Sequence, residues 1–313
     1  MTDMQISIVI PVLNELESLP ILLDELIVNL ESYDEWEVIF IDDGSTDGST
    51  EWLIDLCSTR KKFKLIQFYR NFGKSAALSE GFKIAGGKHI ITMDADLQDD
   101  PAEIINLVNK LNEGWDLVSG WKKNRLDPLN KRLPSKIFNF VTRIFTGVKI
   151  HDFNCGLKGY KRSVVKSIDI YGGRHRYIPA LAGQKRFKVT EIIVNHRARE
   201  FGVTKYGGSR LFHGFFDLIT ILFLNRYTQR PLHLFGFFGL LFILIGTSAE
   251  IVVLYKKFIL GNNFQKHFAL ITFGAMSFIL GLWFFSIGLI GEMIAVSQQR
   301  QENRIRQFIS VDQ

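Results

Sequence analysis

Two long uncharged segments in the last third of the chain constrain the fold more than any other feature. No Asp, Glu, Lys or Arg occurs at 231–249 or among the 25 residues at 267–291, and both segments are mostly apolar. A helix rises about 1.5 Å per residue, so about 20 apolar residues cross a hydrocarbon core of about 30 Å. The sequence therefore predicts transmembrane helices at 232–255 and 267–296, with a buried hairpin of a soluble protein as the alternative.

Two spans return the chain to the side of the membrane on which it starts. Residues 1–5 lead directly into a strand pattern without a leader sequence, so we expect a large N-terminal part on the cytosolic face of the plasma membrane. The positive charges beside the spans favour this orientation by a modest margin. Five arginines lie before the first span or after the second: Arg226, Arg230, Arg300, Arg304 and Arg306. Three lysines lie in or near the loop between the spans: Lys256, Lys257 and Lys266.

The length allows one domain of the size of a typical enzyme and an additional part, and the composition is unusually apolar for a soluble protein. The chain has 313 residues, 47% of them hydrophobic, 27 Phe and a formal net charge of +6. Two cysteines, Cys57 and Cys155, are too few for a disulfide framework, which indicates a reducing compartment. We expect the basic surplus to face membrane lipid rather than nucleic acid.

The first 230 residues alternate between strand and helix patterns. Apolar strand-like runs occur at 6–12, 36–42, 63–69 and 89–95. Between the first two, leucines and isoleucines recur at helical spacing after Ser18, which is placed to cap that helix. Such alternation predicts an α/β fold with a mostly parallel sheet and helices on both faces. Ligands of such sheets bind at the carboxyl ends of the strands.

The first three strands are followed by polar motifs. They read "PVLNELE" (11–17), "DDGSTDGS" (42–49) and "RNFGKSAALSEG" (70–81). A dinucleotide fingerprint is excluded because the first motif has no glycine. A Walker A loop is excluded because Phe68 stands five positions before Gly73, where that loop requires glycine.

The fourth strand ends in "ITMDADLQDD" (91–100), which carries four aspartates. In an extended segment, residues two apart point the same way, so Asp94, Asp96 and, if the extension persists, Gln98 share one face. Oxygen ligands of this kind suit Mg²⁺ or Mn²⁺; a solvated turn is the alternative. Asp99 and Asp100 are expected to begin the next helix, because "DPAE" (100–103) resembles a helix start.

Taken together, the motifs resemble a known family. The segments "IPVLNE" (10–15), "IDDGSTD" (41–47), "NFGKSAALSEGF" (71–82) and "MDADLQ" (93–98) are similar to those of the GT-A glycosyltransferases of family 2. Three later segments, followed by two spans, resemble the polyisoprenyl-phosphate glycosyltransferases. These segments are "DFNCGLKGYKR" (152–162), "RHRYIPALAG" (174–183) and "HRAREFGVTKYG" (196–207).

The resemblance implies a domain organisation and roles for the donor site. It implies a GT-A domain at 1–208 followed by two spans. Together with the apolar patterns, this predicts an interfacial helix at 209–230, two spans within 231–296 and a basic tail at 297–313, for which the family offers no counterpart. It places Pro11, Glu15, Asp43, Lys74 and Asp94 at the nucleotide sugar, and Asp94, Asp96 and Gln98 at the metal and diphosphate. Simpler alternatives stay open: Pro11 ends a strand, and Asp42 and Asp43 only stabilise their turn.

The resemblance also implies ligands for the phosphates of the lipid or the donor, namely Lys122, Arg125, Arg132, Arg199 and Lys205. Arginine suits bidentate phosphate recognition. Members of the family often have arginine two residues after the glycine at the end of the fifth strand. This sequence has Lys122 there, which leaves that contact open.

Two segments are predicted to lie at the membrane surface. In 133–148, Ile137, Val141, Ile144 and Val148 share a helical stripe with other apolar residues, and basic residues lie off it. The alternative is a helix that packs in the core. Residues 210–230 form a second apolar segment, with arginine at both ends.

The predicted function is transfer of one sugar from a nucleotide sugar, with UDP-glucose favoured, to polyprenyl phosphate, with inversion at the sugar. Asp96 and Asp152 are the expected catalytic residues. The resemblance places Asp152 where the family has a catalytic base, but a phosphate monoester is already largely dianionic near pH 7 and needs little deprotonation. The alternatives are that Asp152 positions a cation or the sugar hydroxyls, or that it is a plain turn residue. A GDP-mannose donor, a processive polysaccharide synthase and a non-catalytic scaffold are the alternatives. The hairpin could also self-associate.

Overall fold

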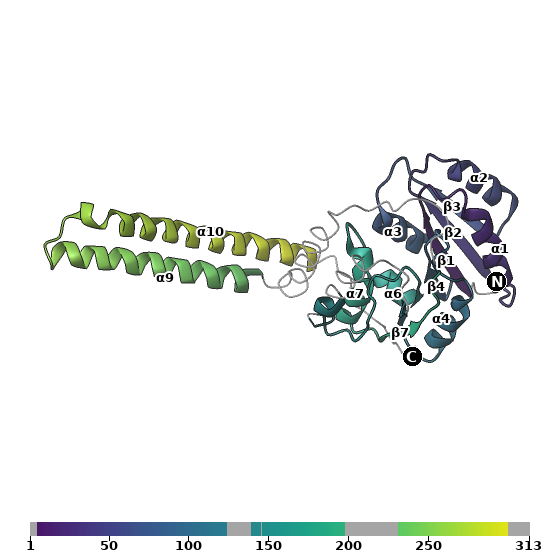
Figure 1. Cartoon of the computed structure of the whole chain (residues 1–313). Coiled ribbons are helices and arrows are strands. Elements are labelled where there is room, and N and C mark those ends of the chain that lie inside the picture. The colour runs from purple at the N-terminus through teal and green to yellow at the C-terminus, as the bar shows by residue number, and fades with distance from the viewer. Residues whose placement is uncertain (1–4, 124–138, 145, 198–230, 300–313) are drawn as a thin grey trace, which may run out of the picture. The chain divides into compact units, whose positions relative to one another are not determined.

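The computed structural model describes residues 5–123, 139–144, 146–197 and 231–299, and the structural statements below concern these residues (Figure 1). The chain forms two compact units, Met1–Leu218 and Ile219–Gln313.

The first unit is built around a seven-stranded sheet in the order β3-β2-β1-β4-β6-β5-β7. Its strands are β1 Ile6–Val12, β2 Trp36–Asp42, β3 Phe63–Gln67, β4 His89–Thr92, β5 Leu117–Trp121, β6 Lys158–Lys161 and β7 Val189–Ile193. All neighbouring pairs are parallel except those of β6, which runs antiparallel to both β4 and β5. The predicted mostly parallel α/β sheet is confirmed.

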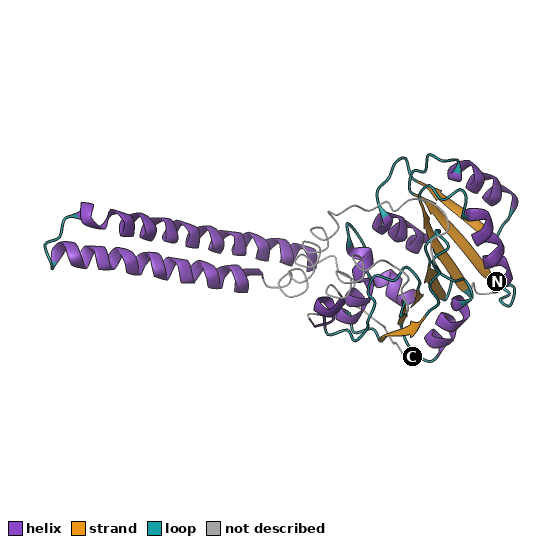
Figure 2. Ribbon diagram, in the orientation of Figure 1, coloured by secondary structure: helices purple, strands orange, loops and turns teal. Residues whose placement is uncertain are grey.

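Helices cover both faces of this sheet (Figure 2). They are α1 Leu19–Leu30, α2 Ser49–Thr59, α3 Lys74–Ile84, α4 Glu103–Asn112, α6 Arg162–Ser167, η1 Arg174–Tyr177 and α7 Ile178–Gln184. Each face of the sheet has its own hydrophobic core. Alternate residues of β1 belong to different cores, because successive side chains of a strand point to opposite faces. Ile8 and Ile10 pack with α1, α2 and α4, whereas Val9 packs with α3, α6 and α7.

The strands match the sequence-based prediction closely at their starts. β1 and β2 have the predicted bounds, whereas β3 ends at Gln67 and β4 at Thr92, each earlier than expected. Ser18 occupies the N-cap position of α1, but its hydroxyl donates to the Glu15 carbonyl at 2.9 Å instead of accepting from the helix. β6 approaches from a distant part of the chain and inserts beside β4, so it brings residues 154–160 to the end of that strand.

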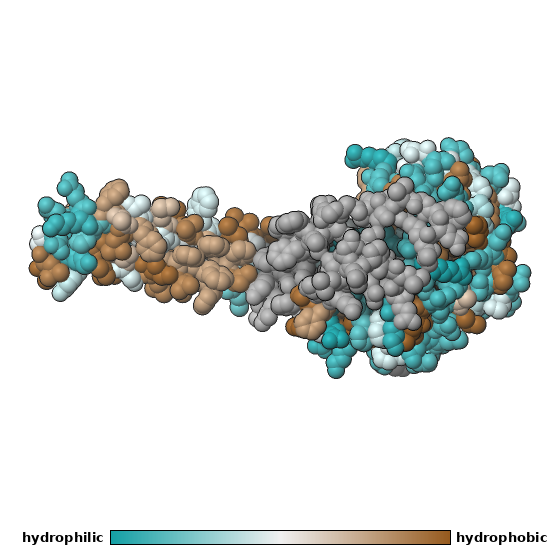
Figure 3. Space-filling model, in the orientation of Figure 1, coloured by the Kyte–Doolittle hydropathy of each residue, from teal (hydrophilic) through white to brown (hydrophobic). Residues whose placement is uncertain are grey.

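The second unit contains α9 Pro231–Phe258, η2 Phe264–His267 and α10 Phe268–Gln299. Glycines allow the two long helices to approach closely: a Cβ on Gly246 would lie 2.6 Å from the Gly274 carbonyl oxygen. Large apolar side chains face outward, with Phe237, Leu244 and Trp283 between 56% and 68% exposed. Figure 3 shows apolar surface along much of the two long helices. Both helices are long and apolar enough to cross a membrane, as predicted.

Candidate active site

Short polar side chains join the loops that follow β1 and β2. The Ser45 hydroxyl accepts the Asn14 N–H at 2.9 Å, and the Asn14 side-chain oxygen accepts the Thr46 N–H at 2.7 Å. Asn14 has φ of 53°, a left-handed conformation that asparagine tolerates better than most residues. The Glu15 N–H donates to the Ser49 hydroxyl at 3.0 Å. These bonds hold Glu15 beside the second loop.

Asp42 stabilises the turn after β2. Its carboxylate accepts the Ser45 N–H at 3.0 Å and the Thr50 hydroxyl at 2.5 Å. Gly44 has φ of 79°, and a Cβ there would lie 2.7 Å from the Arg70 carbonyl carbon. The motif therefore requires glycine at this position, where the loops after β2 and β3 touch.

Asp43 connects that turn to the start of α3. Its carboxylate accepts the N–H groups of Phe72 at 2.7 Å and Gly73 at 3.0 Å. Burial raises the pKa of Asp43 above its ordinary value, against the opposing effect of these two bonds. The next residue, Lys74, is the first of α3, so the "GKS" fragment is a helix start.

The loop after β4 departs from the expected extended conformation. The strand ends at Thr92, Leu97 has φ of 60°, and the Gln98 N–H donates to the Asp96 carboxylate at 3.3 Å, as in a turn. The assumption that the extension persists to Gln98 was wrong. Exposure nevertheless alternates: Asp94, Asp96 and Gln98 are partly exposed. The residues between and before them are buried: Met93, Ala95 and Leu97.

Asp99 is a buried partner of Lys122 rather than the start of a helix, so that prediction was wrong. Its side chain is 0% exposed and lies 2.7 Å from the Lys122 ammonium, and it also accepts the Asp94 N–H at 3.2 Å. Burial alone would lower the pKa of Lys122, but Asp99 raises it above its ordinary value. This pair supports the backbone of the acidic loop, and the predicted phosphate contact of Lys122 stays a prediction.

Asp100 lies just before α4, which begins at Glu103 instead of Pro101. The Asp100 carboxylate accepts the Ala102 N–H at 3.1 Å, so it supports the helix start in part as predicted. It also pairs with the Arg197 guanidinium at 2.8 Å. Arg197 therefore ties residues near the end of β7 to the acidic loop.

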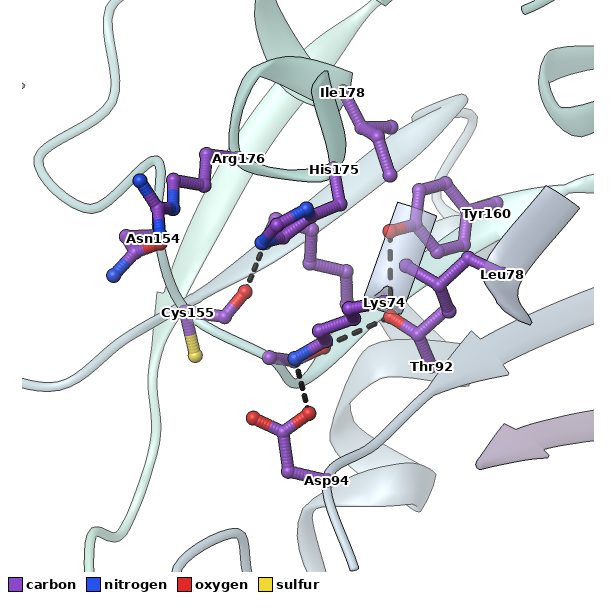
Figure 4. A pocket seen from close by; sticks show the side chains of 12 residues that line it. Lys74, Leu78, Thr92, Asp94, Asn154, Cys155, Tyr160, His175, Arg176 and Ile178 are labelled. Carbon is purple, nitrogen blue, oxygen red and sulfur yellow. Dashed lines mark hydrogen bonds and ion pairs between the residues drawn. The ribbon is translucent and has the colours of Figure 1, made fainter. Parts of the chain in front are cut away.

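A cavity of about 130 Å³ opens beside Asp94 (Figure 4). α3, the end of β4, the segment entering β6 and η1 each contribute to its walls. The lining residues are Lys74, Leu78, Thr92, Asp94, Asn154, Cys155, Gly156, Lys158, Tyr160, His175, Arg176 and Ile178.

Lys74 and Asp94 form an ion pair at the edge of this cavity. Burial would raise the pKa of Asp94, but the Lys74 ammonium lowers it to about 2. A Cβ on Gly156 would lie 2.5 Å from an Asp94 carboxylate oxygen, so the backbone must approach this carboxylate closely. The Gly156 carbonyl accepts the Thr92 hydroxyl at 2.8 Å, which fixes that approach.

His175 is held against α3 by Ser75. The His175 backbone N–H donates to the Ser75 hydroxyl oxygen at 3.1 Å, and the same oxygen lies 2.9 Å from Nδ1 of the His175 ring. Burial, together with nearby cations, lowers the pKa of His175 to about 2, so the ring is neutral near pH 7.

Asp152 is 2% exposed and lies in the segment that leads into β6. Its carboxylate accepts the Asn154 N–H at 3.1 Å, and its carbonyl accepts the Ser119 hydroxyl at 3.1 Å. Asn154 lines the cavity. The geometry supports a role for Asp152 in shaping this segment, and its role as a base stays a prediction.

Comparison with known families decides the class of the protein. The sequence model of the family described as "Glycosyl transferase family 2" matches residues 7–169. This range includes the polar motifs that follow β1, β2, β3 and β4. The chain belongs to glycosyl transferase family 2.

Curated relatives of this glycosyltransferase match nearly its full length. It is 37% identical over 315 residues to dodecaprenyl-phosphate galacturonate synthase of Rhizobium johnstonii, covering 96% of this chain and 90% of the relative. It is 35% identical over 307 residues to undecaprenyl-phosphate 4-deoxy-4-formamido-L-arabinose transferase of Salmonella choleraesuis, covering 97% and 92% respectively.

Solved structures support the GT-A fold. Glucosyl-3-phosphoglycerate synthase from Mycobacterium tuberculosis superposes with a TM-score of 0.56 at 21% identity, covering 71% of this chain and 80% of that one. The same enzyme in complex with Mn²⁺ and UDP-glucose also gives 0.56. At this identity the similarity establishes the fold alone.

The acidic loop of this glycosyltransferase fits a divalent cation. Within the described part of the chain, no three His, Cys, Asp or Glu side chains gather into a complete metal site. Mg²⁺ is commonly held by one or two carboxylates together with substrate phosphates, so a complete protein site is not required. The partly exposed Asp94, Asp96 and Gln98 offer two carboxylates and an amide oxygen, which are the hard ligands such a cation prefers.

Of the residues that line the cavity, sequence reasoning gave roles only to Lys74 and Asp94. Neither Lys158 nor His175 received a role from the sequence, yet both line the cavity. The sequence signal was their position in the segments 152–162 and 174–183, which carry part of the family resemblance. Spacing alone could not join these segments to Asp94.

Several predictions fall wholly or partly outside the described residues. Arg125, Arg132, Arg199, Lys205 and the helix expected at 209–230 lie outside them. Of the helix predicted within 133–148, the described part has Phe140 and Ile144 56% and 60% exposed, whereas Val148 is 8% exposed.

Proposed function

We propose that the protein transfers a single sugar from a nucleotide sugar to polyprenyl phosphate. The observation that carries this proposal is the cavity between Lys74, Asp94 and His175, at the strand ends of a family 2 glycosyltransferase that also has two membrane-length apolar helices. Both full-length relatives are named for sugar transfer to a polyprenyl phosphate.

The donor would lie across the carboxyl ends of the strands. Pro11, Glu15 and Asp43 would line the nucleotide, with Glu15 and Asp43 already fixed by neighbouring loops. Pro11 lies within β1, which continues to Val12, so it does not end its strand. Asp94, Asp96 and Gln98 would hold Mg²⁺ or Mn²⁺, which when bound neutralises the charge that develops on the diphosphate.

The reaction is a single displacement. An oxygen of the lipid phosphate forms a bond to the anomeric carbon, and the bond from that carbon to the nucleotide diphosphate breaks with its electrons leaving on the diphosphate. A single displacement of this kind inverts the configuration at the anomeric carbon. Lys122, Arg125, Arg132, Arg199 and Lys205 are proposed phosphate ligands, and Asp96 and Asp152 the catalytic residues.

We further propose an inner-membrane location with the catalytic unit on the cytosolic face and with α9 and α10 as the anchor. A UDP-linked donor is favoured over a GDP-linked one. The preference for UDP-glucose stays a prediction, since the two relatives are named for galacturonate and formamido-arabinose. Self-association through the hairpin is a further prediction.

A donor panel tests the proposal. Full-length protein in detergent is incubated with Mg²⁺ or Mn²⁺, undecaprenyl phosphate and labelled UDP- or GDP-sugars. We expect one donor to give a chloroform-soluble product whose mass corresponds to one added sugar. Several added sugars would favour a processive synthase, and no product with any donor would refute the transferase proposal.

A further inference from the structure

The Asp94 carboxylate has two positive partners, one observed and one proposed. Its Oδ1 atom forms an ion pair with the Lys74 ammonium, which Figure 4 shows directed at the carboxylate. The proposed function assigns the same carboxylate to Mg²⁺ or Mn²⁺. An ammonium and a metal ion cannot occupy the same position at one oxygen, so the two partners of Asp94 compete.

The rest of the Asp94 carboxylate is close to the Gly156 backbone. A Cβ on Gly156 would lie 2.5 Å from Oδ2 and 3.0 Å from Oδ1, so the backbone covers one face of the carboxylate. A metal ion at either oxygen would lie close to the Lys74 ammonium, because both oxygens belong to one small planar group. Like charges at such short range repel strongly where water is partly excluded. Coordination of a metal ion by Asp94 therefore requires Lys74 to move away.

The formal charges around the cavity are balanced. The groups that act on one another are three lysines and three aspartates: Lys74, Lys122, Lys158, Asp94, Asp99 and Asp152. Asp96 in the acidic loop and Arg176 at the cavity wall add one charge of each sign. A divalent cation that entered alone would leave this site with an excess of positive charge. A nucleotide diphosphate supplies negative charge, so we expect the site to accept the cation and the diphosphate together more readily than the cation alone.

Among these lysines, Lys74 is the one best placed to change its partner. It is the first residue of α3, and its side chain is 25% exposed, so its flexible stem is not enclosed by a core. Lys122 is 11% exposed and pairs with the fully buried Asp99, which braces the acidic loop. Lys158 is buried, and its ammonium donates to the Cys155 carbonyl oxygen.

We propose that Lys74 changes partners when the donor binds: its ammonium moves from Asp94 to the diphosphate, and this movement releases Asp94 to coordinate the divalent cation. The inference rests on the proposed function and adds a coupling between its two ligands. Nucleotide and cation strengthen each other's binding through Lys74. By linkage the effect is reciprocal, and couplings of this kind typically amount to about 5-fold to 150-fold in affinity.

Titration calorimetry on the full-length protein in detergent measures the coupling. The dissociation constant of Mn²⁺ is determined without nucleotide and with saturating UDP or GDP, whichever the protein binds. Titrations without protein account for the association of Mn²⁺ with free nucleotide. The coupling factor is the ratio of the two dissociation constants. We expect the nucleotide to tighten Mn²⁺ binding to the wild-type protein by about tenfold or more.

Lys74→Met should change two quantities by the same factor. Without nucleotide it should bind Mn²⁺ about tenfold more tightly than the wild type, because Asp94 no longer has to release an ammonium. Its coupling factor should fall by an equal amount, since the nucleotide has no lysine to draw away from Asp94. Lys74→Arg, which keeps a cation beside Asp94, should retain most of the coupling. Lys83→Met is the matched control on α3: it removes an exposed lysine that pairs with Glu80, and it should match the wild type in both quantities.

The melting temperature without ligand checks the fold of Lys74→Met. It should stay within a few degrees of the wild type, because the side chains of Lys74 and Asp94 are both partly exposed and such pairs contribute little to stability. A drop of more than about 10 °C would make this ion pair a structural one and would count against the proposed change of partners.

The outcomes distinguish this inference from the proposed function. If Lys74→Met tightens Mn²⁺ binding equally with and without nucleotide, the coupling factor is unchanged, and Lys74 is a fixed charge that does not change partners. A coupling factor near one in the wild type would overturn the inference as well. Neither result would affect the proposed function where the wild type transfers a sugar in the donor panel. Failure of the wild type to bind or transfer any UDP- or GDP-sugar would overturn both proposals.

Discussion

The two ends of the sheet in the first unit treat buried charge in opposite ways. At the amino end, Glu37 is 2% exposed and forms bonds with the Ser7 hydroxyl at 2.5 Å, the Gly86 N–H at 2.8 Å and the Lys64 ammonium at 2.5 Å. Burial would raise the pKa of Glu37, but these partners lower it below its ordinary value. At the carboxyl end, Lys158 is also buried; its ammonium donates to the Cys155 carbonyl oxygen and interacts electrostatically with the carboxylates of Asp152 and Asp94.

The difference separates a structural charge from a functional one. Glu37 has matched partners from β1, β3 and the segment before β4, so its charge fastens these elements together. Lys158 lines a cavity, and so does Asp94, one of the carboxylates that act on it. A buried charge that lines a cavity can meet a ligand there, whereas Glu37 joins strands to each other.

The largest expected effect is at the carboxyl end. Asp96→Ala should lower turnover by about a thousandfold or more, because it removes a proposed ligand of the catalytic cation. The melting temperature should stay near that of the wild type, since the side chain is partly exposed. Asp55→Ala, at an exposed position of α2, is the matched control and should keep full activity. Unchanged turnover in Asp96→Ala would refute the metal assignment.

A substitution at the amino end of the sheet should lower stability and leave turnover unchanged. Glu37→Ala should lower the free energy of unfolding by about 3 kcal/mol, because it leaves the Gly86 N–H and the Ser7 hydroxyl without their acceptor. The fraction that remains folded should keep its kcat. Denaturant unfolding and turnover, measured on the same preparation, check this; a loss of kcat with no loss of stability would break the comparison.

Gly156→Ala probes the contact between backbone and carboxylate. The added Cβ would lie 2.5 Å from an Asp94 oxygen, so the carboxylate must move. We expect turnover to fall about tenfold to a hundredfold, in line with the effect of misplacing a group by about 1 Å. Gly147→Ala is a spatial control, since no atom lies within 4 Å of a Cβ there, although its φ of 71° adds local strain. Normal activity of Gly156→Ala would argue against a fixed Asp94.

The smallest expected effect concerns pH. The pKa of His175 is lowered to about 2 in the folded protein, against about 6.5 when unfolded, so the unfolded state takes up the proton first. Stability is therefore lost as pH falls below about 6.5. His175→Gln should reduce this loss by about 1 kcal/mol at pH 5.5. Melting temperatures at pH 7.5 and 5.5 measure it, and an identical pH dependence in both proteins would contradict a neutral His175.

Much of the architecture could be predicted from the sequence because it depends on local pattern. The bounds of β1 and β2, the two apolar helices and the loops at the strand ends follow from apolar periodicity and turn residues. The bend after β4 could not be predicted in the same way. Leu97 adopts a positive φ, which its residue type does not favour, in a loop braced by the buried pair of Asp99 and Lys122.

The sequence by itself determined the positions of the first four strands, the acidic segment after β4 and the membrane-length helices, since each is encoded within a short segment. The tertiary structure decided which distant segments meet. β6 inserts antiparallel beside β4, and this placement brings Lys158 to the cavity at Asp94. Ser75 binds His175 across 100 residues of sequence. Such contacts depend on sheet order and packing, which spacing along the chain does not specify.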